Sequence, residues 1–212
     1  MFPPDLSILS NNNICSEKLP FYSPKLHYPF FVLIITLLAN CQILNAQVSQ
    51  RYSVATSKLS FISEANLETI KANSVTMSGI IDPITRSLAF KVSNTSFSGF
   101  NTDLQKDHFN ENYMESDLFP YCTFSGKIID EVDFKLDGSF QVRVKGVLTI
   151  RGIGKERIIK GFIYVKGDEI FISTDFWVPL SDYNIRIPRL VQQKIAQDIH
   201  VFVEAKMKRD NK

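Results

Sequence analysis

The chain has 212 residues, of which 44% are hydrophobic and 22% are charged, as in folded globular proteins rather than disordered ones. Its formal net charge is +2, and its lysines and arginines are interspersed with acidic residues rather than gathered in a block. The sequence therefore predicts no nucleic-acid-binding surface, because such a surface needs clustered cations that follow the phosphates.

The first 46 residues differ in composition from the rest of the chain. A polar stretch with several prolines precedes an apolar run at residues 30–39, and a short polar segment then leads to Ala46. A helix of about ten residues spans roughly 15 Å, half of a membrane's hydrocarbon core, and is too short to cross it. We interpret residues 1–46 as a signal peptide with a long leader and residues 47–212 as the mature domain. This predicts a periplasmic or secreted bacterial protein.

Two alternatives to a cleaved signal peptide stay open. The apolar run could remain attached as a membrane anchor, and Leu-Ala-Asn-Cys at residues 38–41 is similar to a lipoprotein signal in which Cys41 is acylated. After removal of residues 1–46 only Cys122 remains, and one thiol cannot form an internal disulfide. We predict that Cys122 is a small buried hydrophobic residue rather than a nucleophile.

From residue 51 onward, apolar and polar residues alternate with a period of two, which is typical of antiparallel strands with one buried face. The clearest run is residues 140–150, and turn sequences such as Asp137-Gly138 and Gly167-Asp168 separate the runs. Residues 152–155 are expected to form the turn between strands at 140–150 and 158–165. About eight strands at this spacing predict an all-β, eight-stranded antiparallel barrel.

Two segments interrupt this alternation. Residues 101–117 begin with helix-capping residues, so we predict one or two short helices there. Residues 187–196 place Pro188 ahead of Leu190, Val191 and Ile195, which predicts a second short helix with one apolar side.

Three ordered motifs carry a resemblance to a known family. Residues 108–126 contain a histidine-bearing insert that leads to Phe-Pro and then to a Thr-Phe-x-Gly strand. Residues 146–155 match the pattern Gly-x-Leu-Thr-x-x-Gly-x-x-Lys, and residues 182–188 contain Asp-Tyr-Asn-Ile followed by Ile-Pro. Residues 51–208 thus resemble the YceI-like family of exported bacterial proteins. The resemblance implies a lipocalin-like barrel with a tunnel for a polyisoprenoid, such as a quinone or a polyprenyl phosphate.

Strand alternation gives a set of inward-facing candidates for ligand binding. They are Phe61, Phe90, Phe124, Val142, Val144, Leu148, Phe162, Tyr164, Ile172 and Phe176. Each could also be an ordinary core residue, and a register error of one residue would invert a strand's set. His108 is the polar candidate: it could hydrogen-bond a quinone or pyrophosphate head group, or fix the insert to the barrel.

The remaining charged residues predict no metal site and no catalytic site. Four acidic residues recur at every fourth position, which indicates a solvated helix face rather than metal ligands: Asp103, Asp107, Glu111 and Glu115. Arg186 and Arg189 could meet an anionic head group or form surface ion pairs. The sequence has no Gly-x-Ser-x-Gly, His-Glu-x-x-His, Cys-x-x-Cys or phosphate-loop motif.

We therefore predict a carrier that binds an isoprenoid lipid or a similar amphiphile, uses no cofactor or metal, and catalyses no reaction. Its mature form is expected to have no stable membrane span, and formation of a homodimer stays open. The alternatives are a protein that sequesters fatty acids or other amphiphiles, an isomerase or hydrolase that acts inside the barrel, and a fully packed structural barrel.

Overall fold

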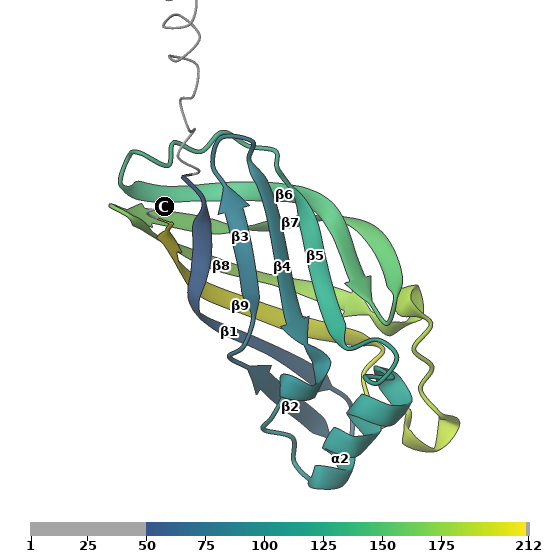
Figure 1. Cartoon of the computed structure of the whole chain (residues 1–212). Helices are drawn as coiled ribbons and strands as arrows, with labels where there is room; N and C mark the ends of the chain where they lie inside the picture. Colours follow the sequence, from purple (N-terminus) through teal and green to yellow (C-terminus); the bar gives the residue numbers. More distant parts are fainter. Residues whose placement is uncertain (1–49, 211–212) are drawn as a thin grey trace, which may run out of the picture. The chain divides into compact units, whose positions relative to one another are not determined.

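The computed structural model describes residues 50–210, so the predicted signal peptide and Cys41 lie outside the described residues. Within this range, one antiparallel sheet contains nine strands (Figure 1). They are β1 (Tyr52–Glu64), β2 (Thr69–Ser74), β3 (Ser78–Asp82), β4 (Ser87–Ser93), β5 (Tyr121–Ile128), β6 (Gly138–Ile150), β7 (Ile153–Lys166), β8 (Glu169–Pro179) and β9 (Asp198–Arg209).

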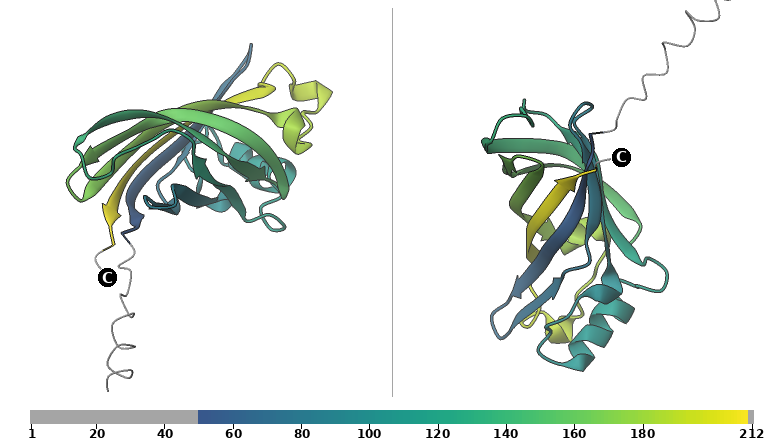
Figure 2. Two further views of the ribbon diagram at one scale, coloured as in Figure 1. Left: turned by 90° about the horizontal axis from the view of Figure 1, so that it is seen from above. Right: turned by 60° about the vertical axis from the view of Figure 1, so that its left-hand side comes forward.

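Pairing between the first and last strands closes the sheet into a barrel (Figures 1 and 2). β1 pairs with β9 from Tyr52 opposite Arg209 to Ile62 opposite His200, and its first two residues also pair with β3. The ring of β1 and β3 to β9 confirms the predicted eight-stranded antiparallel barrel. β2 is an additional strand, paired with the second half of β1, that the sequence analysis did not predict.

The insert between β4 and β5 is helical, as predicted. After a 3-10 turn, η1 (Asn94–Ser96), the helix α2 (Asp103–His108) continues into a π-helical turn, η2 (Phe109–Tyr113). The Thr102 hydroxyl caps α2 by accepting a hydrogen bond from the Gln105 backbone N–H at 3.2 Å. In Figure 1 this insert lies at the same end of the barrel as β2.

The prediction of a helix at residues 187–196 is wrong. Only one 3-10 turn, η4 (Arg189–Val191), forms there. Another 3-10 turn, η3 (Leu180–Tyr183), precedes it directly after β8. The Gln193 carbonyl accepts a hydrogen bond from the backbone N–H of Leu67, in the turn between β1 and β2, at 2.8 Å. This long-range contact engages a carbonyl that a continuing helix would use for its own hydrogen bonds.

The turn between β6 and β7 is tighter than predicted. β7 begins at Ile153, which pairs with Ile150, so only Arg151 and Gly152 form the turn. Both have positive φ, 51° and 70°, as the preferred two-residue hairpin turn requires. Arginine rarely adopts this conformation, and its side-chain contacts are described below.

Side chains fill the end of the barrel where β1 begins and β9 ends. The fully buried residues there are Tyr52, Ile81, Ile128, Val165, Ile170 and Met207. Phe134, from the loop between β5 and β6, packs against Tyr52 with ring centroids 5.8 Å apart. The Tyr52 hydroxyl accepts a hydrogen bond from Arg209 Nη2 at 2.8 Å. This end of the barrel is therefore closed, away from α2.

Two glycines let neighbouring strands approach closely in the barrel wall. Gly126 of β5 lies opposite Gly146 of β6. A Cβ atom at Gly146 would lie 2.5 Å from the Ser125 carbonyl oxygen and 2.9 Å from the Phe124 ring. The absence of a side chain at this position thus lets Phe124 lie across the neighbouring strand.

Replacement Gly146→Ala should lower the free energy of unfolding by about 1–3 kcal/mol, because the strands and the Phe124 ring must move apart. Urea-induced unfolding measures this change. Gly138→Ala is the control, since its Cβ would lie an ordinary 3.6 Å from the Phe140 ring. Equal losses of stability in the two variants would contradict the proposed close packing.

Candidate functional site

An apolar cavity lies inside the barrel between its filled end and the helical insert. It has an inner compartment of about 130 Å³ and an outer compartment of about 520 Å³. Both compartments are lined by the same residues where they adjoin: Leu59, Val92, Cys122, Leu148 and Phe176. The cavity is thus continuous in its lining and widens toward α2.

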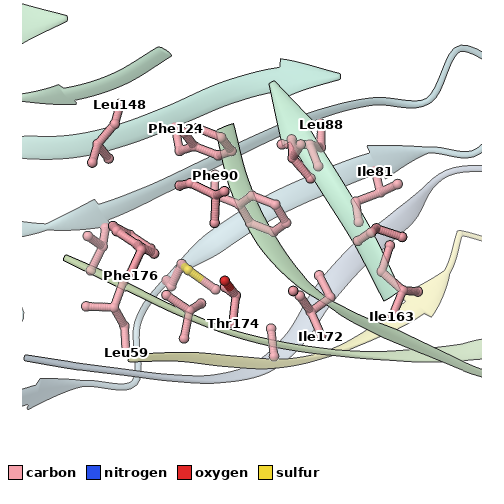
Figure 3. A pocket seen from close by; sticks show the side chains of 18 of the residues that line it. Leu59, Ile81, Leu88, Phe90, Phe124, Leu148, Ile163, Ile172, Thr174 and Phe176 are labelled. Carbon is pink, nitrogen blue, oxygen red and sulfur yellow. The ribbon is translucent and has the colours of Figure 1, made fainter. Parts of the chain in front are cut away.

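Aliphatic and aromatic side chains form most of the wall of the inner compartment (Figure 3). Phe90, Phe124 and Ile172 point into it from three different strands. Thr174 also lies on this wall, and its hydroxyl donates a hydrogen bond to the Lys160 carbonyl at 2.6 Å. Since that hydroxyl already has a partner, this compartment favours an apolar occupant.

Aromatic residues from β1 and from the insert form one wall of the outer compartment. Phe61 of β1 stacks on Phe109 of η2 with ring centroids 5.5 Å apart, and Phe97 lies 5.4 Å from Phe61. Such aromatic contacts stabilise the position of the insert over the barrel. Ile185, Val191 and Ile195, from the segment between β8 and β9, also line this compartment.

Polar groups are found in the outer compartment, near the insert. Gln105 Nε2 donates a hydrogen bond to Glu68 Oε1 at 2.6 Å, which holds α2 against the turn between β1 and β2. His108 is exposed at the end of α2 and lines the compartment together with Lys194. A ligand with one polar end could therefore place that end here and its apolar part deeper in the barrel.

Cys122 lies where the two compartments adjoin. Burial raises the pKa of its thiol to about 12, so at neutral pH the thiol stays protonated. Its Sγ donates a hydrogen bond to Asn94 Oδ1 at 3.1 Å, and Asn94 is fully buried. A protonated thiol is a poor nucleophile, so this geometry favours a structural role for Cys122.

Most of the predicted ligand-binding residues lie on the cavity wall. These are Phe61, Phe90, His108, Phe124, Val142, Val144, Leu148, Ile172 and Phe176. Their contact with a ligand stays a prediction. The structure brings the aliphatic and aromatic members together inside the ring and leaves His108 at its open end.

The inward placement of two residues of β7 needs correction. Ile159, Ile163 and Val165 are the buried residues of this strand. Phe162 and Tyr164 therefore project from its outer face, with 51% and 46% of their surfaces exposed. Tyr164 lies outside both compartments, and Phe162 borders the inner one beside Gly161. Both alternating sets of β7 contain large apolar residues, so hydrophobicity did not identify the buried face.

Apart from His108, the cavity residues that lie outside strands were not predicted from the sequence. Phe97 and Phe109 belong to the insert, and Ile185, Val191 and Ile195 belong to the segment after β8. Their signal in the sequence is the occurrence of isolated apolar residues within otherwise polar segments. Without the topology, nothing in the sequence indicates that these two segments meet at one end of the barrel.

Arg151 connects the three motifs that were singled out in the sequence. Its Nη1 donates a hydrogen bond to the Asn184 carbonyl at 2.8 Å, and its Nη2 forms an ion pair with Glu115. All three residues have positive φ. Backbone strain of this kind persists where surrounding contacts hold it. These contacts join the insert, the turn between β6 and β7, and the segment after β8.

Within residues 50–210, no group of three or more His, Cys, Asp or Glu side chains could hold a metal ion. No helix in that part of the chain is long and apolar enough to cross a membrane.

Three solved structures share this fold at low sequence identity. A polyisoprenoid-binding domain from Saccharophagus degradans, implicated in plant cell wall breakdown, has a TM-score of 0.64 and 14% identity, over 75% of this chain and 98% of that domain. BcnA from Burkholderia cenocepacia has a TM-score of 0.59 and 16% identity, over 71% and 95% of the two chains. The YceI protein of Campylobacter jejuni has a TM-score of 0.55 and 17% identity, over 71% and 91%.

No curated protein sequence shows significant similarity to this chain. The model of the YceI-like domain family, however, matches residues 47–207, which include β1 to β8 and β9 as far as Met207. The chain therefore belongs to the YceI-like domain family.

Proposed function

We propose that the protein binds a long apolar ligand inside the barrel, and that this ligand is a polyisoprenoid such as a quinone or a polyprenyl phosphate. The cavity carries the proposal: an apolar inner compartment of about 130 Å³ adjoins an outer one of about 520 Å³. The combined volume of the two compartments falls within the range of known ligand pockets, about 300–1,000 Å³. The description of a relative as a polyisoprenoid-binding domain supports the ligand class.

The distribution of polar groups suggests how such a ligand would be oriented. Burial of an apolar chain contributes about 0.8 kcal/mol per methylene, so most of the affinity would come from the tail. The tail would occupy the inner compartment, where Thr174 already has a hydrogen-bond partner. The head group would remain in the outer compartment beside His108 and Lys194.

A binding function is favoured over catalysis by the chemistry of the cavity wall. The Cys122 thiol is protonated, and His108 is exposed at the mouth rather than deep among the apolar residues. An enzyme acting on the buried part of a ligand would need a reactive group there. We therefore propose a carrier, with fatty acids and other amphiphiles as the alternative ligands that the experiments below distinguish.

We also propose that the protein is exported and acts in the periplasm or outside the cell. The support is the sequence pattern described above: an apolar run at residues 30–39 that is too short for a membrane span, followed by Ala46. In this proposal residues 1–46 are removed and residues 47–212 form the mature protein.

Mass spectrometry of the protein released by its own host should show an N-terminus at or near Gln47, because the short apolar run is expected to direct cleavage after Ala46. Recovery of residues 1–46 in the membrane fraction would contradict export by cleavage. A mature chain that begins with acylated Cys41 would instead support the lipoprotein alternative.

Replacement Phe176→Glu should weaken binding of the co-purifying lipid by at least about 30-fold, because the ring lines both compartments and its loss removes about 2 kcal/mol of apolar contact. Native mass spectrometry and lipid extraction measure the bound ligand and identify its class. Phe171→Glu is the matched control, since Phe171 lies on the outer face of the same strand. Unchanged retention in a folded Phe176 variant would place the ligand elsewhere.

Replacement His108→Ala separates a carrier from an enzyme. In a carrier, the free energy of ligand binding should become less favourable by the value of one or two hydrogen bonds, about 1–3 kcal/mol, while the apolar tail is still retained. In an enzyme that uses His108 as an acid or base, binding should persist while turnover falls about 100-fold. Incubation with isoprenoid quinones and pyrophosphates, followed by product analysis, distinguishes the two. A product that depends on His108 would refute the carrier.

A further inference from the structure

The segment between η3 and β9 has a basic outer side and an exposed aliphatic side chain. Residues 184–197 contain Arg186, Arg189 and Lys194 and no acidic residue. All three cationic residues are exposed, and none forms an ion pair with another residue of the described range 50–210. Leu190 stands between them with 97% of its surface exposed.

The same segment forms part of the rim of the cavity. Three of its other aliphatic residues, Ile185, Val191 and Ile195, line the outer compartment. The segment thus turns three aliphatic side chains and Lys194 toward the cavity, while Arg186 and Arg189 lie outside its lining. A fully exposed leucine at this place is notable, because three neighbouring aliphatic residues are turned inward.

Two more exposed leucines lie on the same rim. Leu67, 66% exposed, is held next to the segment by its backbone hydrogen bond to Gln193. Leu104 of α2, 61% exposed, lines the same compartment. Exposed aliphatic side chains around the mouth of an apolar cavity mark a surface that contacts an apolar partner.

The charge on the rim is asymmetric. α2 carries Asp103 and Asp107, which are exposed, so the insert offers no net positive surface. On the other side of the mouth, the segment 184–197 carries three cations and no acidic residue. An anionic partner would therefore be met by this segment first, with Leu190 at the point of contact.

We propose that the segment 184–197 docks the protein on the surface of an anionic lipid bilayer, with Leu190 inserted among the lipids and with Arg186 and Arg189 against the head groups. Cations beside aliphatic side chains are the combination by which peripheral proteins bind such surfaces. An acidic protein would satisfy the cations, but a bilayer also provides an apolar phase for the leucines. The biological purpose, exchange of a lipid ligand at the mouth, rests on the proposed function; the docking itself does not.

A local reporter tests the docking in the full-length chain. Trp177 is the only tryptophan, so Trp177→Phe with Leu190→Trp places a single fluorophore at the proposed contact. Phosphatidylcholine vesicles with brominated acyl chains, with or without phosphatidylglycerol, quench a tryptophan that enters them. We expect quenching at position 190 only when phosphatidylglycerol is present. This quenching should weaken as the salt concentration rises from about 0.1 M to about 1 M, because the Debye length falls from about 10 Å to about 3 Å.

Substitutions test the two components of the contact separately. Changing Arg186 and Arg189 to glutamine should weaken vesicle binding about 25-fold, since each cation near an anionic surface contributes about fivefold. In the chain without a reporter at position 190, Leu190→Ser should weaken vesicle binding about tenfold. Changing Lys127 and Lys166 to glutamine removes the same charge from other exposed positions and should have little effect.

The position of the reporter provides the second control. Leu136→Trp, in the same tryptophan-free background, places the fluorophore in the exposed loop before β6, at the filled end of the barrel. Absence of quenching at position 190, equal quenching at positions 190 and 136, or equal losses in the two double glutamine variants would each overturn the proposal. Absence of quenching would point to an acidic protein as the partner instead. Each outcome is independent of ligand retention in the cavity, so failure of the docking and failure of the lipid-binding function are distinguishable.

Discussion

The barrel is held closed by the pairing of β1, its first strand, with β9, its last. This pairing closes the ring, and a ring of eight strands can either fill its interior with side chains or enclose a small ligand. This barrel does both at different levels. Around Tyr52 the interior is filled, whereas around Leu59 it is open.

The change occurs along β1, which pairs with β3 only through Tyr52 and Ser53 and then continues with β2 as its other neighbour. The insert, through Phe97 and Phe109, packs against the part of β1 that has left β3.

The open end depends on contacts that strands alone cannot provide. Arg151 binds Glu115 and the Asn184 carbonyl, and Arg157 Nη2 forms an ion pair with Asp182 at 2.7 Å. These contacts hold segments that are far apart in the sequence around one opening. They also give a physical reason for the motifs on which the family resemblance rested. Only some residues of these motifs line the cavity. Several others fix the loops that form its mouth.

The parts of the fold that follow from local periodicity could be predicted, and those that depend on tertiary contacts could not. The alternation in β6 identified its buried face, since its outward positions include Gln141, Arg143 and Lys145. In β7 large apolar residues occupy both faces, so the choice of Phe162 and Tyr164 over Ile163 was wrong. β2 reads Thr-Ile-Lys-Ala-Asn-Ser and has too little hydrophobic contrast to predict a strand. The cavity itself depends on the space that remains between side chains of the insert and side chains of the segment after β8. No single segment of the sequence encodes this space.

The arrangement along the barrel axis connects the proposed binding to the proposed docking. From the filled end outward, the lining changes from aliphatic and aromatic side chains to a compartment that includes His108 and Lys194, and then to a rim with exposed leucines. Moving a polyisoprenoid through water would cost about 0.8 kcal/mol for each exposed methylene, a barrier that grows with the length of the chain. A rim that rests in a bilayer removes most of this cost, because the chain passes from one apolar environment into another. The tail would then enter first, and the head group would stop at the polar outer compartment, where the surface charge of the membrane still stabilises the docked protein.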